Sequence, residues 1–214
     1  MTTVENSLFI TFEGGEGAGK TTLVDGIQKS LQAQGLSVLR TREPGGTPLG
    51  EAIRGLLLEQ KRGMPIGAEA ECLLFLAARA QHLDGVIAPA LNQGKIVLCD
   101  RFHDSSIAYQ GGGRCLGIAH VKNLCDLVCR GVKPTLTFYL DIDPEVGLRR
   151  AAQARSADRM EQEKLTFHQR VRDAFLLLAK EDPERICVLD ATKTPDELLN
   201  EALRKIESFC AKCR

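Results

Sequence analysis

Short apolar runs alternate along the chain with longer amphipathic stretches. Apolar positions recur at helical spacing over residues 20–34 and over most of 67–92, with a candidate interruption near Pro89. The segment Thr194-Pro195-Asp196-Glu197 is a typical helix start, because Thr caps a first turn and Pro fits within it. Short runs bounded by glycine, proline or polar residues predict five strands, at 8–12, 37–40, 96–99, 136–140 and 186–189.

The spacing of these strands predicts an α/β fold. Strands joined by helical stretches of ten or more residues pair in parallel through right-handed crossovers, so helices cover both faces of the sheet. We therefore expect a five-stranded parallel sheet flanked by helices on both faces, in one domain spanning residues 1–214. Ligands of such sheets bind beyond the carboxyl ends of the strands. The segments that follow the first three strands, 13–22, 42–47 and 100–114, are the most unusual of the sequence.

The composition argues against several classes of protein. Lys plus Arg and Asp plus Glu both number 28, so the net charge is zero, unlike that of a general nucleic-acid binder or a polybasic membrane-surface protein. No apolar stretch reaches the roughly 18 residues of a membrane span. The N-terminus lacks the features of a secretory signal, and the eight cysteines are scattered, as reduced thiols of a cytosolic core are. We expect a cytoplasmic protein without nucleic-acid or membrane partners.

Residues 14–21, Gly-Gly-Glu-Gly-Ala-Gly-Lys-Thr, match the G-x-x-x-x-G-K-[ST] motif without a mismatch. Glycines let consecutive backbone N–H groups converge on phosphate oxygens at the positive end of the following helix. Lys20 would reach the β- and γ-phosphates, and the Thr21 hydroxyl would bind Mg²⁺. The motif predicts a nucleoside triphosphate site whose members are Gly14, Gly15, Glu16, Gly17, Ala18, Gly19, Lys20 and Thr21.

The third predicted strand runs into Asp100-Arg101. A carboxylate there would organise Mg²⁺, directly or through water, and a guanidinium beside it would bridge donor and acceptor phosphates. Tyr139-Leu140-Asp141 is a second candidate for the carboxylate, and a surface ion pair is the alternative for Asp100-Arg101. The sequence has no Asn-Lys-x-Asp segment for reading guanine. Phosphoryl transfer to a second small substrate therefore fits better than a regulatory GTPase.

Four segments together resemble one family. In chain order they are the motif at 14–21, Thr41–Thr47 (TREPGGT), Leu74–Arg79 (LFLAAR) and Asp100–Arg114 (DRFHDSSIAYQGGGR). They are similar to thymidylate kinases of the bacterial type, and the resemblance covers Leu8 to Leu203. It implies a P-loop nucleoside monophosphate kinase fold and transfer of the ATP γ-phosphoryl group to dTMP, giving dTDP and ADP in dTTP biosynthesis. It also implies a requirement for Mg²⁺ and a homodimer.

The resemblance assigns the acceptor pocket as well. Phe75 and Arg79 lie four residues apart on one helix face. In the family the matching ring stacks on thymine and the matching arginine binds a base carbonyl. Arg42 matches the arginine that holds the 5′-phosphate, and the Tyr109 ring would lie near the deoxyribose 2′ position, where it would exclude a ribose hydroxyl. The other matches to substrate-binding positions are Glu13, Arg101, Ser105, Ser106 and Gln110.

Two features of the segment after the third strand are given no chemical role. The attacking oxygen belongs to a phosphate that is already ionised, so the reaction needs no general base. We therefore interpret His103 as a loop residue. The run Gly111–Gly113 is interpreted as a tight turn around the acceptor pocket.

In the family, a mobile lid closes over the triphosphate, and its match here is about 149–162. Members without an arginine in the P-loop supply a catalytic arginine from the lid, and this P-loop holds Glu16 instead. The resemblance thus implies three catalytic residues, namely Lys20, Arg101 and a lid arginine that Arg155 matches best. Arg150 and Arg159 are alternates, because this lid is shorter than the common pattern.

Two alternatives stay open at this point. A P-loop kinase for another acceptor, such as UMP or CMP, AMP or a deoxynucleoside, would share the phosphate site but not the pairs Phe75/Arg79 and Tyr109/Gln110. A regulatory nucleotide-binding protein would bind ATP and form no product from any monophosphate.

Overall fold

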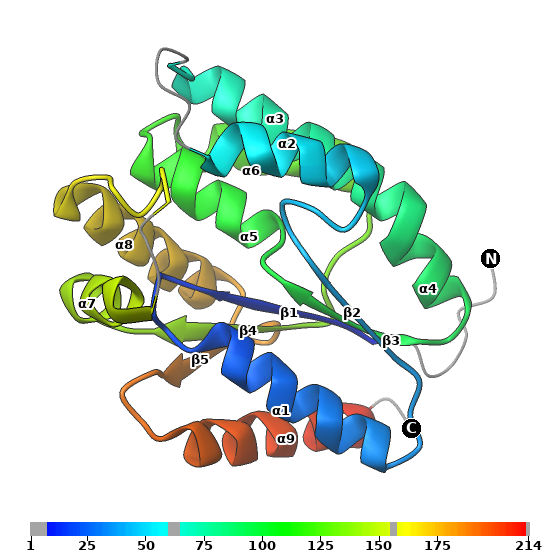
Figure 1. The fold of residues 1–214 in the computed structure, drawn as a ribbon. Helices are drawn as coiled ribbons and strands as arrows, with labels where there is room; N and C mark the ends of the chain where they lie inside the picture. Colours follow the sequence, from blue (N-terminus) through cyan, green and yellow to red (C-terminus); the bar gives the residue numbers. More distant parts are fainter. Residues whose placement is uncertain (1–7, 60–64, 155–157, 213–214) are drawn as a thin grey trace.

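The computed structural model describes residues 8–59, 65–154 and 158–212. It contains the strands β1 (Phe9–Gly14), β2 (Val38–Arg42), β3 (Ile96–Asp100), β4 (Leu136–Asp141) and β5 (Ile186–Asp190). They form one sheet in the order β2-β3-β1-β4-β5, and every neighbouring pair is parallel (Figure 1). The predicted five-stranded parallel sheet is therefore confirmed.

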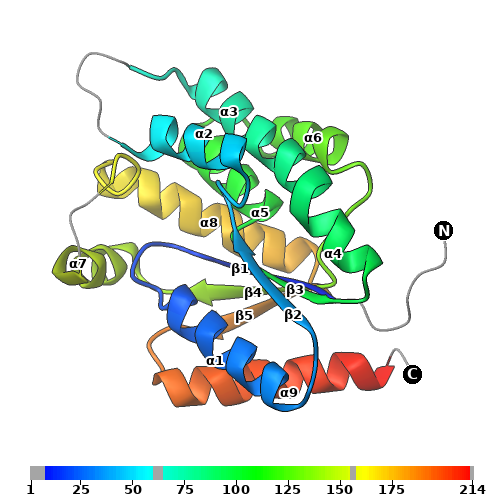
Figure 2. The ribbon, with the colours of Figure 1, turned by 45° about the vertical axis from the view of Figure 1, so that its right-hand side comes forward.

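Helices cover both faces of this sheet. They are α1 (Lys20–Ala33), α2 (Pro48–Leu58), α3 (Ala68–His82), α4 (Ala88–Asn92), α5 (His103–Ser106), α6 (Ile118–Cys129), α7 (Pro144–Ala154), α8 (Leu165–Glu181) and α9 (Pro195–Lys212), with π-helical segments η1 (Leu83–Ile87) and η2 (Ile107–Gly113). One face carries α1 and α9, whereas α5 and α8 cover the other, with α2, α3 and α6 farther out (Figures 1 and 2). No helix of the described ranges is long and apolar enough to cross a membrane.

The two faces of the sheet have separate apolar cores. On the side of α1 and α9, Ile10 and Phe12 of β1 pack in one cluster with Ile27 of α1. Phe9 lies on the other face, where it packs with Ile87 of η1. Burying each of these side chains contributes about 1.5–3 kcal/mol. Because both faces are covered, the central strands β1, β3 and β4 read as nearly continuous apolar runs rather than as alternating patterns.

The strand order brings the predicted site segments together. Asp100 of β3 pairs in register with Phe12 of β1 on one side and with Arg42 of β2 on the other. The segments that follow these three strands therefore emerge side by side at the carboxyl edge of the sheet. Each strand ends one or two residues later than predicted, because main-chain pairing continues into the polar residues of this edge.

The helix predicted over 67–92 is interrupted earlier than expected. Its hydrogen bonding changes to the π-helical pattern over Leu83–Ile87. Pro89 lies in the first turn of α4, where the missing N–H is tolerated. The C-terminal helix begins as predicted, since Thr194 Oγ1 accepts from the Glu197 N–H and the Glu197 carboxylate accepts from the Thr194 N–H.

Two interpretations of the segment after β3 are wrong. His103 is not a loop residue, because it begins α5 and is 8% exposed. Gly111–Gly113 form no turn, since they complete η2. A Cβ on Gly113 would lie 2.6 Å from Cε2 of Phe167 in α8. These glycines instead let η2 pack closely against α8.

Candidate active site

The predicted phosphate-binding loop connects β1 to α1. Gly17 has a positive φ of 65°, and a Cβ there would lie 2.1 Å from the carbonyl oxygen of Gly147 in α7, so only glycine fits. The buried Lys20 donates from Nζ to the carbonyl oxygens of Gly14 (3.1 Å) and Gly15 (2.8 Å). Burial and Arg101 lower the pKa of Lys20. The loop thus curves around its own lysine at the N-terminus of α1, an arrangement suited to phosphate.

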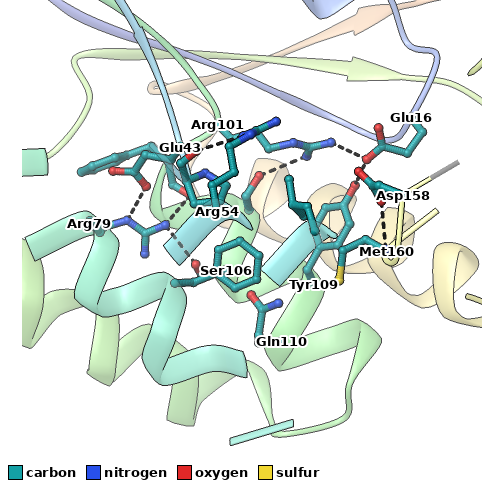
Figure 3. A pocket seen from close by; sticks show the side chains of 15 residues that line it. Glu16, Glu43, Arg54, Arg79, Arg101, Ser106, Tyr109, Gln110, Asp158 and Met160 are labelled. Atoms are coloured by element: carbon teal, nitrogen blue, oxygen red, sulfur yellow. Dashed lines mark hydrogen bonds and ion pairs between the residues drawn. The ribbon is translucent and has the colours of Figure 1, made fainter. Parts of the chain in front are cut away.

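A cavity opens beside this loop (Figure 3). Its walls come from the phosphate-binding loop, the segments that follow β2 and β3, the helices α2, α3, α5 and η2, and the residues that precede α8. The fold therefore assembles the cavity from segments far apart in the sequence. The predicted site residues that line it are Glu16, Phe75, Arg79, Arg101, Ser105, Ser106, Tyr109 and Gln110. Lining residues that were not predicted are Glu43, Pro44, Arg54, Leu58, Phe102, Asp158 and Met160.

Arg101 joins the phosphate-binding loop to the cavity. Its Nη1 donates to the Gly14 carbonyl oxygen (3.0 Å), and its Nη2 donates to Glu16 Oε1 (2.6 Å). Its guanidinium also lies 5.0 Å above the Tyr109 ring, whose hydroxyl donates to Glu16 Oε1 (3.1 Å). Burial alone would raise the pKa of Glu16, but Arg101 and Lys20 hold it at about 2. The guanidinium of Arg101 is therefore held in a fixed position at this end of the cavity, where it could contact phosphate groups on both sides.

Arg79 organises the opposite end of the cavity. It is 2% exposed, and its Nε donates to Glu43 Oε2 (2.8 Å). Its Nη2 donates to the Phe102 carbonyl oxygen (3.0 Å) and to Ser106 Oγ (2.9 Å), as Figure 3 shows for the side-chain contacts. Phe75 lines the same cavity from the same helix. A flat ring beside a fixed fork of N–H donors is an arrangement that binds a planar base with carbonyl groups.

Glu13 lies behind the cavity rather than in its wall. It is fully buried and accepts hydrogen bonds from the Phe102 N–H (2.8 Å) and the Ser105 hydroxyl (2.5 Å). Burial and the neighbouring Asp104 raise the pKa of Glu13 to about 8. In this structure Glu13 therefore fixes the first turn of α5 through its hydrogen bonds to Phe102 and Ser105.

The other predicted phosphate and metal residues lie at the carboxyl edge of the sheet. Arg42 does not line the cavity; its side chain is 53% exposed and its Nη2 lies 3.1 Å from Glu51 Oε2. Asp100 ends β3, and its charge acts on Lys20. Thr21 is exposed in the first turn of α1. A hydroxyl and a carboxylate are oxygen donors of the kind that Mg²⁺ prefers.

Asp141, the second candidate for the metal carboxylate, is already paired. Arg172 of α8 donates to both of its oxygens, at 2.8 and 2.9 Å, and the Tyr139 hydroxyl donates to Oδ1 at 3.0 Å. The hydrogen bonds from Arg172 lower the pKa of Asp141. These contacts favour Asp100 over Asp141 as a ligand of a cation.

Comparisons with known proteins agree with this geometry. The family model described as thymidylate kinase matches residues 12–202. The thymidylate kinase of Protochlamydia amoebophila is 50% identical over 206 residues, which cover 93% of this chain and 92% of the relative. That of Bacillus pumilus is 46% identical over 209 residues, covering 97% and 98%. The chain belongs to the thymidylate kinase family.

As a member of this family, the protein phosphorylates dTMP to dTDP with ATP as the phosphoryl donor, in nucleotide biosynthesis. A crystal structure of the thymidylate kinase from Ehrlichia chaffeensis has 35% sequence identity and a TM-score of 0.76, covering 94% of this chain and 99% of that one. The expected P-loop nucleoside monophosphate kinase fold is thereby confirmed. The family therefore does not favour the two alternatives left open by the sequence, a P-loop kinase that acts on another acceptor and a regulatory nucleotide-binding protein.

The lid predicted for this thymidylate kinase is described in part. Arg155, its predicted catalytic residue, lies outside the described residues. Arg150 Nη1 donates to the Ala191 carbonyl oxygen (3.0 Å), and Arg159 Nε donates to that of Leu57 (2.6 Å). Both alternates therefore bind backbone carbonyl groups in this structure.

Sequence reasoning missed the acidic partners of three arginines in and around the cavity, of which Arg79 is buried and Arg114 and Arg159 are partly buried. Glu43, 5% exposed, pairs with Arg79, and the fully buried Glu71 pairs with Arg114 and Arg159. A signal existed for the first pair, since an arginine inside a pocket needs an anion nearby. No spacing rule connects residues so far apart in sequence, so the partner's identity required the fold.

Proposed function

We propose that dTMP binds in the cavity with its base between Phe75 and Arg79 and its phosphate toward Arg101, while ATP binds on the loop at 14–21. The observation that carries this proposal is that Arg101 contacts the loop through Gly14 and also lines the cavity. One guanidinium would therefore contact both the acceptor phosphate and the γ-phosphate of ATP. Such a bridge holds two mutually repelling phosphates in line for transfer.

Transfer in this site rests on positioning and charge. The acceptor phosphate attacks as an ionised oxygen, so no side chain has to remove a proton. His103 fits this account, because it does not line the cavity and burial lowers its pKa to about 4. Lys20, Arg101 and Arg155 would stabilise the charge on the transferring group, while Arg42 would reach the acceptor phosphate from β2.

We further propose Thr21 and Asp100 as the protein's contribution to a Mg²⁺ site. Their oxygen atoms suit a small, hard cation. The described parts of the chain hold no group of three or more acidic, His or Cys side chains that could bind a metal by themselves, so phosphate oxygens would complete the coordination. The ion would neutralise charge on the β- and γ-phosphates when bound.

Tyr109 is the residue we propose for rejecting ribonucleotides. Its ring is 6% exposed, packs against Phe167 and Phe175, and is held by Glu16 and Arg101. A rigid ring beside the sugar leaves no space for a 2′-hydroxyl. We expect Tyr109→Ala to raise kcat/KM for UMP relative to dUMP by at least about tenfold, the scale of one excluded group. Tyr109→Phe should keep the native ratio, and an unchanged ratio in Tyr109→Ala would contradict the assignment.

We also propose that the protein is cytoplasmic, as its scattered cysteines suggest, and that it forms a homodimer through its outer helix layer. Leu73 of α3 is 58% exposed and Leu127 of α6 is 74% exposed, and Figure 2 shows these helices as part of the layer farthest from α1 and α9. Exposed leucines on neighbouring helices favour association. We expect Leu127→Glu to convert a dimer into a monomer in sedimentation. Leu36→Glu, at an exposed position between α1 and β2, is the control. A wild-type protein that sediments as a monomer would contradict the proposal.

A further inference from the structure

Glu71 is a fully buried carboxylate whose role is not explained by the reacting groups. It lies in the first turn of α3, behind the cavity wall. Oε1 accepts from Gln110 Nε2 (2.9 Å) and Arg114 Nε (3.0 Å), and Oε2 accepts from Arg114 Nη2 (3.0 Å) and Arg159 Nη2 (2.6 Å). Burial alone would raise the pKa of Glu71, but these hydrogen bonds keep it below the ordinary value, so the group stays ionised.

The ionised carboxylate decides which end of the Gln110 amide faces it. A carboxylate only accepts hydrogen bonds, so the nearby end of the amide must be the NH₂ group. The amide oxygen of Gln110 is then directed away from Glu71. Gln110 lines the cavity, and Figure 3 shows its amide end pointing into the cavity from the helix. The cavity wall therefore presents a hydrogen-bond acceptor at this point.

This acceptor has no partner within the described part of the chain. Gln110 Oε1 takes part in no hydrogen bond with the described residues. The atom is also not completely buried, so a ligand in the cavity can reach it. A ligand that places an N–H opposite it would satisfy it. Thymine and uracil carry an N–H at ring position 3, whereas the corresponding nitrogen of cytosine is an acceptor.

We propose that Glu71 is a positioning residue for base selection: by fixing the Gln110 amide with its oxygen toward the cavity, it favours bases with an N–H at position 3 and disfavours cytosine. This inference rests on the acceptor base lying in the cavity, as proposed above. Arg79 is held by Glu43 and not by Glu71, so its contribution to base recognition is independent. Loss of Glu71 should therefore reduce the preference for uracil over cytosine without abolishing it.

The test compares dUMP with dCMP, because both lack the thymine methyl group and differ in the hydrogen-bonding pattern of the base. Their inhibition constants are measured against dTMP turnover in the purified kinase with ATP and Mg²⁺. In Glu71→Gln, the neighbouring amide can donate or accept, so the Gln110 amide can turn around. We expect the preference for dUMP over dCMP to fall about tenfold, the scale of one oriented hydrogen bond.

Three further variants define the result. Glu71→Asp keeps the charge for Arg114 and Arg159 but withdraws the carboxylate from Gln110, so it should narrow the preference even if Glu71→Gln folds poorly. Gln110→Leu should reduce the preference for dUMP over dCMP by a similar factor. The double variant with Glu71→Gln and Gln110→Leu should show the same preference as Gln110→Leu alone. Glu69→Gln, the same substitution at an exposed position of α3, should leave it at the native value.

The outcomes separate this inference from the assignment of the cavity. If Gln110→Leu reduces the preference for dUMP over dCMP but both Glu71 variants keep the native preference, the role of Glu71 is overturned and the cavity assignment stands. A native preference in Gln110→Leu would overturn the assignment of the base to this wall, and the inference with it. A purely structural Glu71 would lower Tm and kcat for every acceptor and leave the ratio between dUMP and dCMP unchanged.

Discussion

Replacing Lys20 by methionine is expected to lower kcat by roughly 100- to 1000-fold or more, with little change in the affinity for dTMP. Lys20 lies at the phosphate-binding loop and not in the cavity wall, so it acts on the transferring phosphoryl group alone. Methionine keeps the length of the buried stem but removes the charge. The measurement is steady-state dTDP formation, with dTMP affinity determined separately by titration.

Lys29→Met is the matched control, because Lys29 is an exposed residue of the same helix. Its kinetic constants should equal those of the unchanged protein. A Lys20→Met enzyme that turns over at more than a tenth of the native rate would contradict the role of Lys20. A fall in dTMP affinity that matches the fall in kcat would show that the lysine supports the acceptor pocket as well.

Arg155→Ala is expected to lower kcat by about 1000-fold, by analogy with arginines that enter the sites of other phosphotransferases. The phosphate-binding loop carries Glu16 where an arginine would otherwise supply this charge. The two alternates are engaged elsewhere in the described structure, Arg150 with the Ala191 carbonyl and Arg159 with Leu57 and Glu71. Arg155 is therefore the arginine we expect to contact ATP, and dTMP affinity should hardly change.

Arg149→Ala tests whether any arginine of this segment suffices. Arg149 is exposed on α7, six residues before Arg155, so its loss removes the same charge from the same region. We expect turnover within about twofold of the native rate, as for exposed surface substitutions in general. Near-native turnover in Arg155→Ala would instead assign the catalytic charge to another residue.

The parallel sheet could be predicted from sequence because its three central strands, β1, β3 and β4, are buried on both faces. The edge strands β2 and β5 are only partly buried. Runs such as 96–99 and 136–140 contain almost no polar residue, and the phosphate-binding motif marks the end of β1. Helices such as α2 and α6 were not predicted. Their apolar residues lie partly in the core and partly on the surface, as the exposed Leu49, Leu56 and Leu127 illustrate. In α2, Gly50 and Gly55 also lower the helix propensity of the segment.

Local motifs predicted the reactive side chains but not the residues that orient them. Arg79 and Gln110 were predicted to bind the acceptor, and both line the cavity. Their partners Glu43 and Glu71 are 36 and 39 residues away in sequence, in loops or helices that only the fold brings near. Glu13 illustrates the converse. The family resemblance places it among the substrate-binding residues, whereas in the structure it is fully buried near the end of β1 and accepts a hydrogen bond from Ser105.

The account's central claim is that the cavity beside Arg101 selects dTMP as the acceptor. The most direct measurement is ADP formation by the purified protein with ATP and Mg²⁺, comparing dTMP with dUMP, dCMP, UMP and AMP at equal concentrations. The account predicts turnover that strongly prefers dTMP, with dUMP ahead of dCMP and UMP. Preferred turnover of another monophosphate, or ATP binding without product from any of them, would contradict it.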